Sequence, residues 1–159
     1  MKPEGPVKHF SLAFLLALLG YALCYQAIEH RRTRNGPWQV TFTRTTTGDP
    51  AIVINHPKLA VTNVQILFAR QSLPPTTNSA TLLFAQPQPV PYDLPFGKCV
   101  FMDTTFLPGT VTLQLFGHEI ELLPRTLILD RQEHPWRHDA VITLLPRHAP
   151  PAQRQPASQ

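Results

Sequence analysis

Residues 110–123 read TVTLQLFGHEIELL, and this stretch shows the pattern that decides the fold of most of the chain. Apolar residues alternate with polar ones on both sides of Gly117-His118. A period of two is typical of strands that bury one face and leave the other toward solvent. A glycine between two such runs favours a tight turn. The stretch therefore predicts a β-hairpin with its turn at Gly117-His118.

The same alternation recurs between residues 38 and 146, and no helical periodicity appears after residue 35. Gly48-Asp49-Pro50 and Leu107-Pro108-Gly109 supply turn chemistry between the runs. The predicted strands are 38–43, 51–55, 59–69, 80–85, 99–105, 110–116, 119–123, 126–130 and 140–145. We therefore predict an all-β domain over 38–146, a small antiparallel β-sandwich of about eight or nine short strands, with a barrel as the alternative.

Two segments are rich in proline and irregular. The 71–97 segment holds six prolines and only one predicted strand, so we expect a loop with extended polyproline character. The C-terminal segment 147–159 has no strong apolar residue, so it cannot bury enough surface to offset the entropy of ordering. We predict that this tail is disordered.

Residues 10–28, FSLAFLLALLGYALCYQAI, form a run of 19 residues without a charge. As a helix this run spans about 28 Å, close to the ~30 Å hydrocarbon core of a bilayer. We predict a transmembrane signal anchor, preceded by a short basic tail over 1–9. The residues expected to face lipid are Phe10, Leu15, Leu16, Leu18, Leu19, Leu23 and Ile28. A cleaved signal peptide, with Gly20-Tyr21-Ala22 as its cleavage site, is the alternative.

A basic juxtamembrane linker is predicted over 29–37. Its Arg31, Arg32 and Arg34 are expected to contact lipid headgroups, because arginines near an anionic surface are attracted to it. These arginines outnumber Lys2 and Lys8 on the other side, a count that favours a cytoplasmic domain. A basic N-terminal tail before an apolar run is nevertheless the usual layout of an export signal. We predict a single-pass protein whose domain lies on the exported (periplasmic or extracellular) side.

The net charge of +4 does not indicate a nucleic-acid-binding domain. Five Lys/Arg against two Asp/Glu lie within 1–37, whereas 38–146 holds seven against eight. A nucleic-acid footprint would be a basic patch on the domain itself. Of the two cysteines, Cys24 lies in the apolar run, so we expect no bridge to Cys99. The predicted partners are the lipid bilayer and a protein, and no nucleic acid.

One cluster of residues could carry acid–base or metal chemistry. His118, Glu119 and Glu121 lie within four residues of one another, but successive strand residues point to opposite faces. His118 should therefore share a face with apolar residues, while the two glutamates face solvent. An enzyme using His118, Glu119 and Asp103 is an alternative function.

A second cluster is His134-Pro135-Trp136-Arg137-His138. Two histidines four residues apart can bind zinc on a helix, but Pro135 disfavours that helix. We predict a loop in which Trp136 closes one end of the sandwich. A further alternative is a small-ligand or carbohydrate site that uses Trp38 or Trp136 as a stacking platform.

The sequence contains no motif for a catalytic residue, a cofactor or a metal. We therefore predict a non-catalytic module that binds a protein or stabilises a membrane-associated assembly. The expected contact surfaces are its sheet edges and the 71–97 segment, because an exposed edge can pair with another strand.

Overall fold

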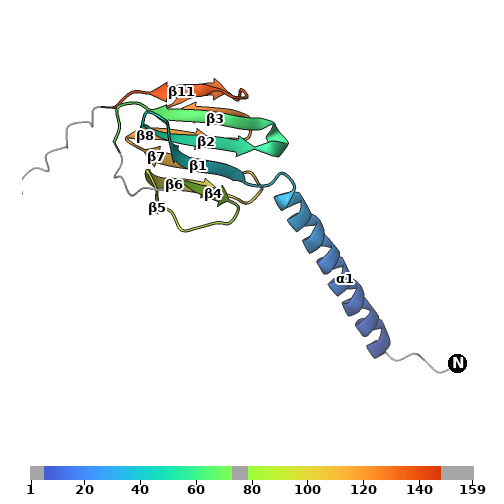
Figure 1. The fold of residues 1–159 in the computed structure, drawn as a ribbon. Helices are drawn as coiled ribbons and strands as arrows, with labels where there is room; N and C mark the ends of the chain where they lie inside the picture. The colour runs from blue at the N-terminus through green and yellow to red at the C-terminus, as the bar shows by residue number, and fades with distance from the viewer. Residues whose placement is uncertain (1–5, 73–78, 148–159) are drawn as a thin grey trace, which may run out of the picture. The chain divides into compact units, whose positions relative to one another are not determined.

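The computed structural model describes residues 6–72 and 79–147, and within them it has one α-helix and eleven strands (Figure 1). The elements are α1 (Pro6–Thr33), β1 (Trp38–Arg44), β2 (Pro50–His56), the 3-10 turn η1 (Pro57–Leu59), β3 (Val61–Phe68), β4 (Ala80–Phe84), β5 (Tyr92–Leu94), β6 (Gly97–Asp103), β7 (Thr110–Leu115), β8 (His118–Leu122), β9 (Thr126–Leu129), β10 (Gln132–Pro135) and β11 (Val141–Leu144). The chain divides into two compact units, Met1–Arg34 and Asn35–Gln159, and we call the second the β-unit. Residues 148–159 of the predicted disordered tail lie outside the described residues.

Helix α1 has 28 residues and extends beyond the predicted 10–28 run at both ends. Proline suits the first turn of a helix, where its missing N–H has no intrahelical acceptor. At the other end, Arg32 makes two hydrogen bonds of 3.1 Å to the carboxylate of Glu29. The hydroxyl of Thr33 donates to the carbonyl of Glu29 at 2.9 Å. Residues 29–33 of the predicted linker are therefore helical, and residues 34–37 lie between α1 and β1 in the chain.

The β-unit contains two sheets, with strand orders β11-β3-β2-β1-β4 and β10-β9-β8-β7-β6-β5. The prediction of an all-β domain is confirmed. Strand β11 pairs in parallel with β3, so a purely antiparallel arrangement was wrong. The chain crosses from β10 to β11 at the end where β3 begins, since the Asp139 amide donates to the Thr62 carbonyl at 3.0 Å. A strand that starts beside the start of β3 must run in the same direction as β3.

Two short edge strands, β5 and β10, were missed by the sequence analysis. β5 has only three residues and lies inside the 71–97 segment, which was predicted to be a loop. β10 includes His134 and Pro135, which were also assigned to a loop. Edge strands tolerate proline and polar residues because one side of their backbone has no strand to bind. Neither strand therefore has the alternating apolar pattern that marks a central strand.

The hairpin of the 110–123 stretch is present, with its turn one residue earlier than predicted. Leu115 pairs with His118, and the two residues between them have φ of 51° at Phe116 and 81° at Gly117. Positive φ at both central positions is the signature of a type I′ turn, whose twist matches that of the strands. His118 is therefore the first residue of β8 and not a turn residue, and its side chain joins the buried face.

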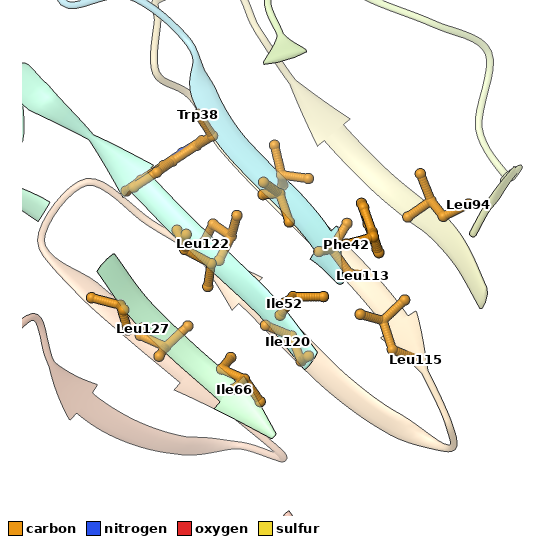
Figure 2. Packing of buried hydrophobic residues seen from close by; sticks show 14 of the residues in the cluster. Trp38, Phe42, Ile52, Ile66, Leu94, Leu113, Leu115, Ile120, Leu122 and Leu127 are labelled. Atoms are coloured by element: carbon orange, nitrogen blue, oxygen red, sulfur yellow. The ribbon is translucent and has the colours of Figure 1, made fainter. Parts of the chain in front are cut away.

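Buried residues of both sheets belong to one hydrophobic cluster (Figure 2). The fully buried aromatic residues Trp38 and Phe42 come from β1. Leu113 and Ile120 come from β7 and β8, and they are also fully buried. The Phe42 and Phe96 rings meet edge to face, 5.3 Å apart. Each such side chain contributes about 1.5–3 kcal/mol by leaving water, so this cluster stabilises the β-unit.

Gly109, between β6 and β7, has φ of 70°, and a Cβ there would lie 1.8 Å from the Asp103 carbonyl oxygen. We expect Gly109→Ala to destabilise the β-unit by about 2–3 kcal/mol, because the clash is with backbone that cannot move aside. Urea unfolding followed by circular dichroism measures this. Gly48→Ala is the matched control, since Gly48 also has positive φ but open space around it. Equal losses in both variants would contradict the steric argument.

Candidate functional site

The predicted anchor residues all lie on α1 with exposed side chains. Their exposed fractions are Phe10 76%, Leu15 64%, Leu16 60%, Leu18 53%, Leu19 57%, Leu23 64% and Ile28 59%. Successive helix residues are about 100° apart, so these side chains are spread over roughly two thirds of the helix circumference. The helix is long and apolar enough to span a membrane. Of the predicted headgroup residues, Arg31 and Arg34 are exposed, whereas Arg32 is partly buried and binds Glu29.

His118 is a buried polar residue of the β-unit, and its side chain is 4% exposed. Its Nδ1 lies 2.7 Å from Asp130 Oδ2, and its Nε2 lies 3.1 Å from the Leu145 carbonyl oxygen. The other carboxylate oxygen, Oδ1, accepts from the Glu119 amide at 3.0 Å and from Arg147 Nη1 at 3.0 Å. We call His118, Asp130, Leu145 and Arg147 the His118 cluster. It joins β8, the turn after β9 and the segment after β11.

The partners of His118 determine which protons its ring carries. A carboxylate and a carbonyl are both acceptors, so the ring makes both bonds at once only when each ring nitrogen carries a proton. The other fully buried histidine, His56, has the opposite pattern. Its Nδ1 accepts from the Leu59 amide at 3.1 Å, which leaves Nε2–H to donate to the Gly36 carbonyl. The bonds of His56 therefore require one ring proton, whereas the two bonds of His118 require two.

Asp130 is the anionic member of the cluster. Burial by itself raises its pKa, but several other effects outweigh it. These effects are the hydrogen bonds from His118 and the Glu119 amide, and the charges of His118 and Arg147. Together they lower the pKa of Asp130. A carboxyl whose pKa is lower in the folded state binds fewer protons than in the unfolded chain. Its stabilisation is therefore complete above the ordinary aspartate pKa of about 3.9 and is lost as pH falls through the folded value.

We expect Asp130→Asn to make the acid limb of the stability curve shallower. The wild-type β-unit should lose about 1 kcal/mol more than the variant between about pH 5 and pH 2, since only the wild type has this carboxylate to protonate. Urea midpoints measured across that pH range test this. Asp93→Asn is the control, because the Asp93 side chain is 88% exposed. Parallel curves for wild type and Asp130→Asn would be evidence against the assignment.

The residues of the alternative enzyme site are not brought together. Asp103 pairs with Thr110 at the start of β7, whereas His118 pairs with Leu115 at its far end. Five residue steps of about 3.3 Å separate these positions along the sheet. The Asp103 carboxylate accepts from the Thr105 amide at 2.9 Å. In the described part of the chain, no group of three His, Cys, Asp or Glu side chains could hold a metal.

The two tryptophans lie together at the end of the sheets where β1 begins, which we call the Trp38 end. Their rings are 5.2 Å apart. Trp38 is fully buried and donates from Nε1 to the Gly109 carbonyl at 3.2 Å. Trp136 is half-buried and donates to the Leu123 carbonyl at 2.9 Å. This arrangement agrees with the predicted role of Trp136 in closing one end, and neither indole offers an open stacking platform.

The cysteines are both free, with Cys24 exposed on α1 and Cys99 buried. Burial raises the pKa of the Cys99 thiol, although hydrogen bonds with Tyr92 and the Phe101 carbonyl oppose this. A raised thiol pKa disfavours the thiolate, which is the nucleophilic form. Cys99 is therefore a core residue that packs between the sheets.

The sequence patterns singled out His118 but not the other three members of the cluster. Asp130 and Leu145 were predicted only as the ends of strands, and Arg147 as the first residue of the tail. The turn after β9 is formed by Asp130 and Arg131, with φ of 52° and 69°. Because neither residue is a glycine, the sequence carried no clear signal of a turn with positive φ at both positions. The 27 residues between His118 and Leu145 put their contact beyond any local pattern.

Comparison of the chain with protein families, curated protein sequences and solved structures gave no match.

Proposed function

We propose that the chain is a single-pass membrane protein in which α1 is a retained signal anchor and the two sheets form a non-catalytic β-sandwich. The sandwich binds an extended segment of a protein partner at the membrane, on the exported side. The all-round apolar surface of α1 supports the anchor, because a helix of this kind is stable in lipid and not in water. The single observation that carries the binding function is the edge formed by β4.

Strand β4 reads ATLLF and contains neither a charge nor a proline. One side of it pairs with β1, from Trp38 opposite Phe84 to Phe42 opposite Ala80. It ends the strand order of its sheet, so among the described strands none pairs with its other side. Leu83 on this strand is 64% exposed. An uncharged, unprotected edge is a template to which an extended segment can add.

Two of the other edges have features that block strand addition. β5 has three residues and lies between Pro91 and Pro95. β10 carries Glu133 and ends in Pro135. Charges and prolines on an edge strand are the usual protection against pairing with another chain. The contrast favours β4 as the binding edge of the two-sheet unit.

Exposed apolar side chains also occur on β4 and on the segments that follow it in the chain. The β-unit has six large apolar residues among the exposed side chains of its described part. They are Leu83, Val90, Phe101, Phe106, Val141 and Leu145. The first four lie on β4, on the connection to β5, on β6 and in the loop after β6. The contact of Phe42 with Phe96 shows that β1 and the turn between β5 and β6 face each other across the core.

The test is site-specific photocrosslinking in native membranes. A photoreactive phenylalanine analogue at Leu83 should give one discrete adduct, and peptide mapping should place it in an extended partner segment. The same analogue at Thr47, an exposed residue of the β1–β2 turn, should give none. Leu83→Lys should reduce recovery of the partner about tenfold, whereas Thr47→Lys should not. Equal adducts at both positions, or none at Leu83, would contradict binding at β4.

A further inference from the structure

Strand β11 and the residues around it form a strap, residues 139–147, that covers the β3 edge of the first sheet. The strap is held mainly by hydrogen bonds. The Gln65 amide donates to the Ala140 carbonyl at 2.8 Å, and the Ala69 amide donates to the Leu144 carbonyl at 3.0 Å. Asn63 Nδ2 donates to the Asp139 carboxylate at 3.0 Å.

Apolar burial contributes little to the strap. Val141 is 58% exposed and Leu145 is 64% exposed. Ile142 and Leu144 are only partly buried against the hydrophobic cluster. Strand β11 of the strap pairs in parallel with β3. Parallel pairing is slightly weaker per residue than antiparallel pairing. Loss of the hydrogen bond at its C-terminal end therefore weakens the hold on that end.

The C-terminal end of the strap is fixed by the His118 cluster. His118 donates to the Leu145 carbonyl, and Arg147 pairs with the Asp130 carboxylate. The groups around His118 come from several elements. Lys98 of β6 and Glu119 of β8 line the same surface depression as His118 and Arg147. Arg131 lies beside Asp130 in a neighbouring depression, and β3 contributes only the Phe68 ring, 6.2 Å from the imidazole.

The bond to Leu145 depends on the charge of His118. A neutral ring has one N–H and must choose between two acceptors. Asp130 remains ionised near neutral pH, because its hydrogen bonds and neighbouring charges lower its pKa. The remaining N–H stays with this carboxylate, since a hydrogen bond to an ionised acceptor is the stronger of the two. The Leu145 carbonyl then faces an unprotonated Nε2, and the bond is lost.

We propose that the strap is a proton-dependent lock on the β3 edge: protonated His118 holds it closed, and the neutral form releases its C-terminal end. An extended strand of alternating apolar residues can then pair with the end of β3 that the released residues covered. This second strand-binding edge is separate from β4 and lies at the opposite side of the same sheet.

Amide hydrogen exchange of the full chain in detergent micelles at pH 5 and pH 8 tests the lock, because histidines change charge in this range. Protection factors are corrected for the intrinsic pH dependence of exchange. The protection factor of Ala69, which binds the C-terminal end of the strap, should fall about tenfold from pH 5 to pH 8, the factor for one lost buried hydrogen bond. That of Gln65, at the other end, should fall less. The Leu123 amide, which donates to Thr126 away from the strap, should not change. Equal protection at both pH values would overturn the proposal.

Asp130→Asn provides the discriminating variant. An asparagine amide can donate to Nδ1 of a neutral His118, whose Nε2–H then still binds Leu145. The variant strap should therefore stay protected at pH 8, without the wild-type fall. Arg147→Gln leaves both His118 bonds in place, so the pH dependence should persist. A wild-type pH dependence in Asp130→Asn would overturn the role of the histidine charge.

The acceptor edge is tested with a fluorescent peptide of residues 140–147, AVITLLPR. The peptide should bind the full chain at pH 8 and not at pH 5, and it should bind Asp130→Asn at neither pH. No binding at pH 8 would overturn the acceptor function of β3. Leu83→Lys should change none of these results, so failure of β4 binding and failure of the lock are distinguishable.

Discussion

Replacing Leu16 and Leu19 with arginine should move the protein out of the membrane fraction. Both residues lie near the middle of the 10–28 run, and both side chains are exposed on α1. An arginine at the centre of a membrane helix costs about 2.5–3.5 kcal/mol on the insertion scale. The double variant should therefore shift partitioning by more than about a hundredfold. Alkaline washing of isolated membranes, followed by immunoblotting, measures the retained fraction.

Leu83→Arg is the matched control for this experiment, because it places the same charge on an exposed leucine outside the helix. This control should stay in the membrane. N-terminal sequencing of the wild-type protein separates an anchor from a cleaved signal peptide. A mature protein that begins directly after Ala22 would contradict the retained anchor.

Trp38→Ala should unfold the β-unit more readily than any other single truncation of its core. The side chain is fully buried, and its ring lies 5.0 Å from His56 and 5.2 Å from Trp136. Truncation of a buried tryptophan costs about 3–5 kcal/mol, and here the Gly109 carbonyl also loses its donor. That loss is a large part of the ~5–15 kcal/mol that stabilises a typical domain. Urea unfolding followed by circular dichroism checks it.

Trp38→Phe separates packing from hydrogen bonding at the same position. It keeps a buried ring but removes the indole N–H, so about 1–3 kcal/mol should be lost. A loss below about 1 kcal/mol for Trp38→Ala would contradict the central place of this residue in the core.

Short-range patterns predicted the central strands well. The alternation around Gly117 predicted the β7–β8 hairpin, and it correctly put His118 on the buried face with Ile120 and Leu122. The same reasoning failed for β5 and β10, where edge positions relax the demand for apolar residues. It also failed for the direction of β11, because this direction depends on the place where the chain crosses from one sheet to the other.

What the sequence by itself determined is local. A run of 19 uncharged residues predicts a helix that can cross a bilayer, and period-two alternation predicts half-buried strands, because both depend only on near neighbours. The tertiary structure decided which strand became the unprotected edge and which acceptors surround His118. The Asp130 and Leu145 partners lie 12 and 27 residues away, and they meet His118 only when the β9–β10 turn and the strap have docked. The protonation of a side chain depends on the groups around it in space, and a local sequence pattern does not specify these groups.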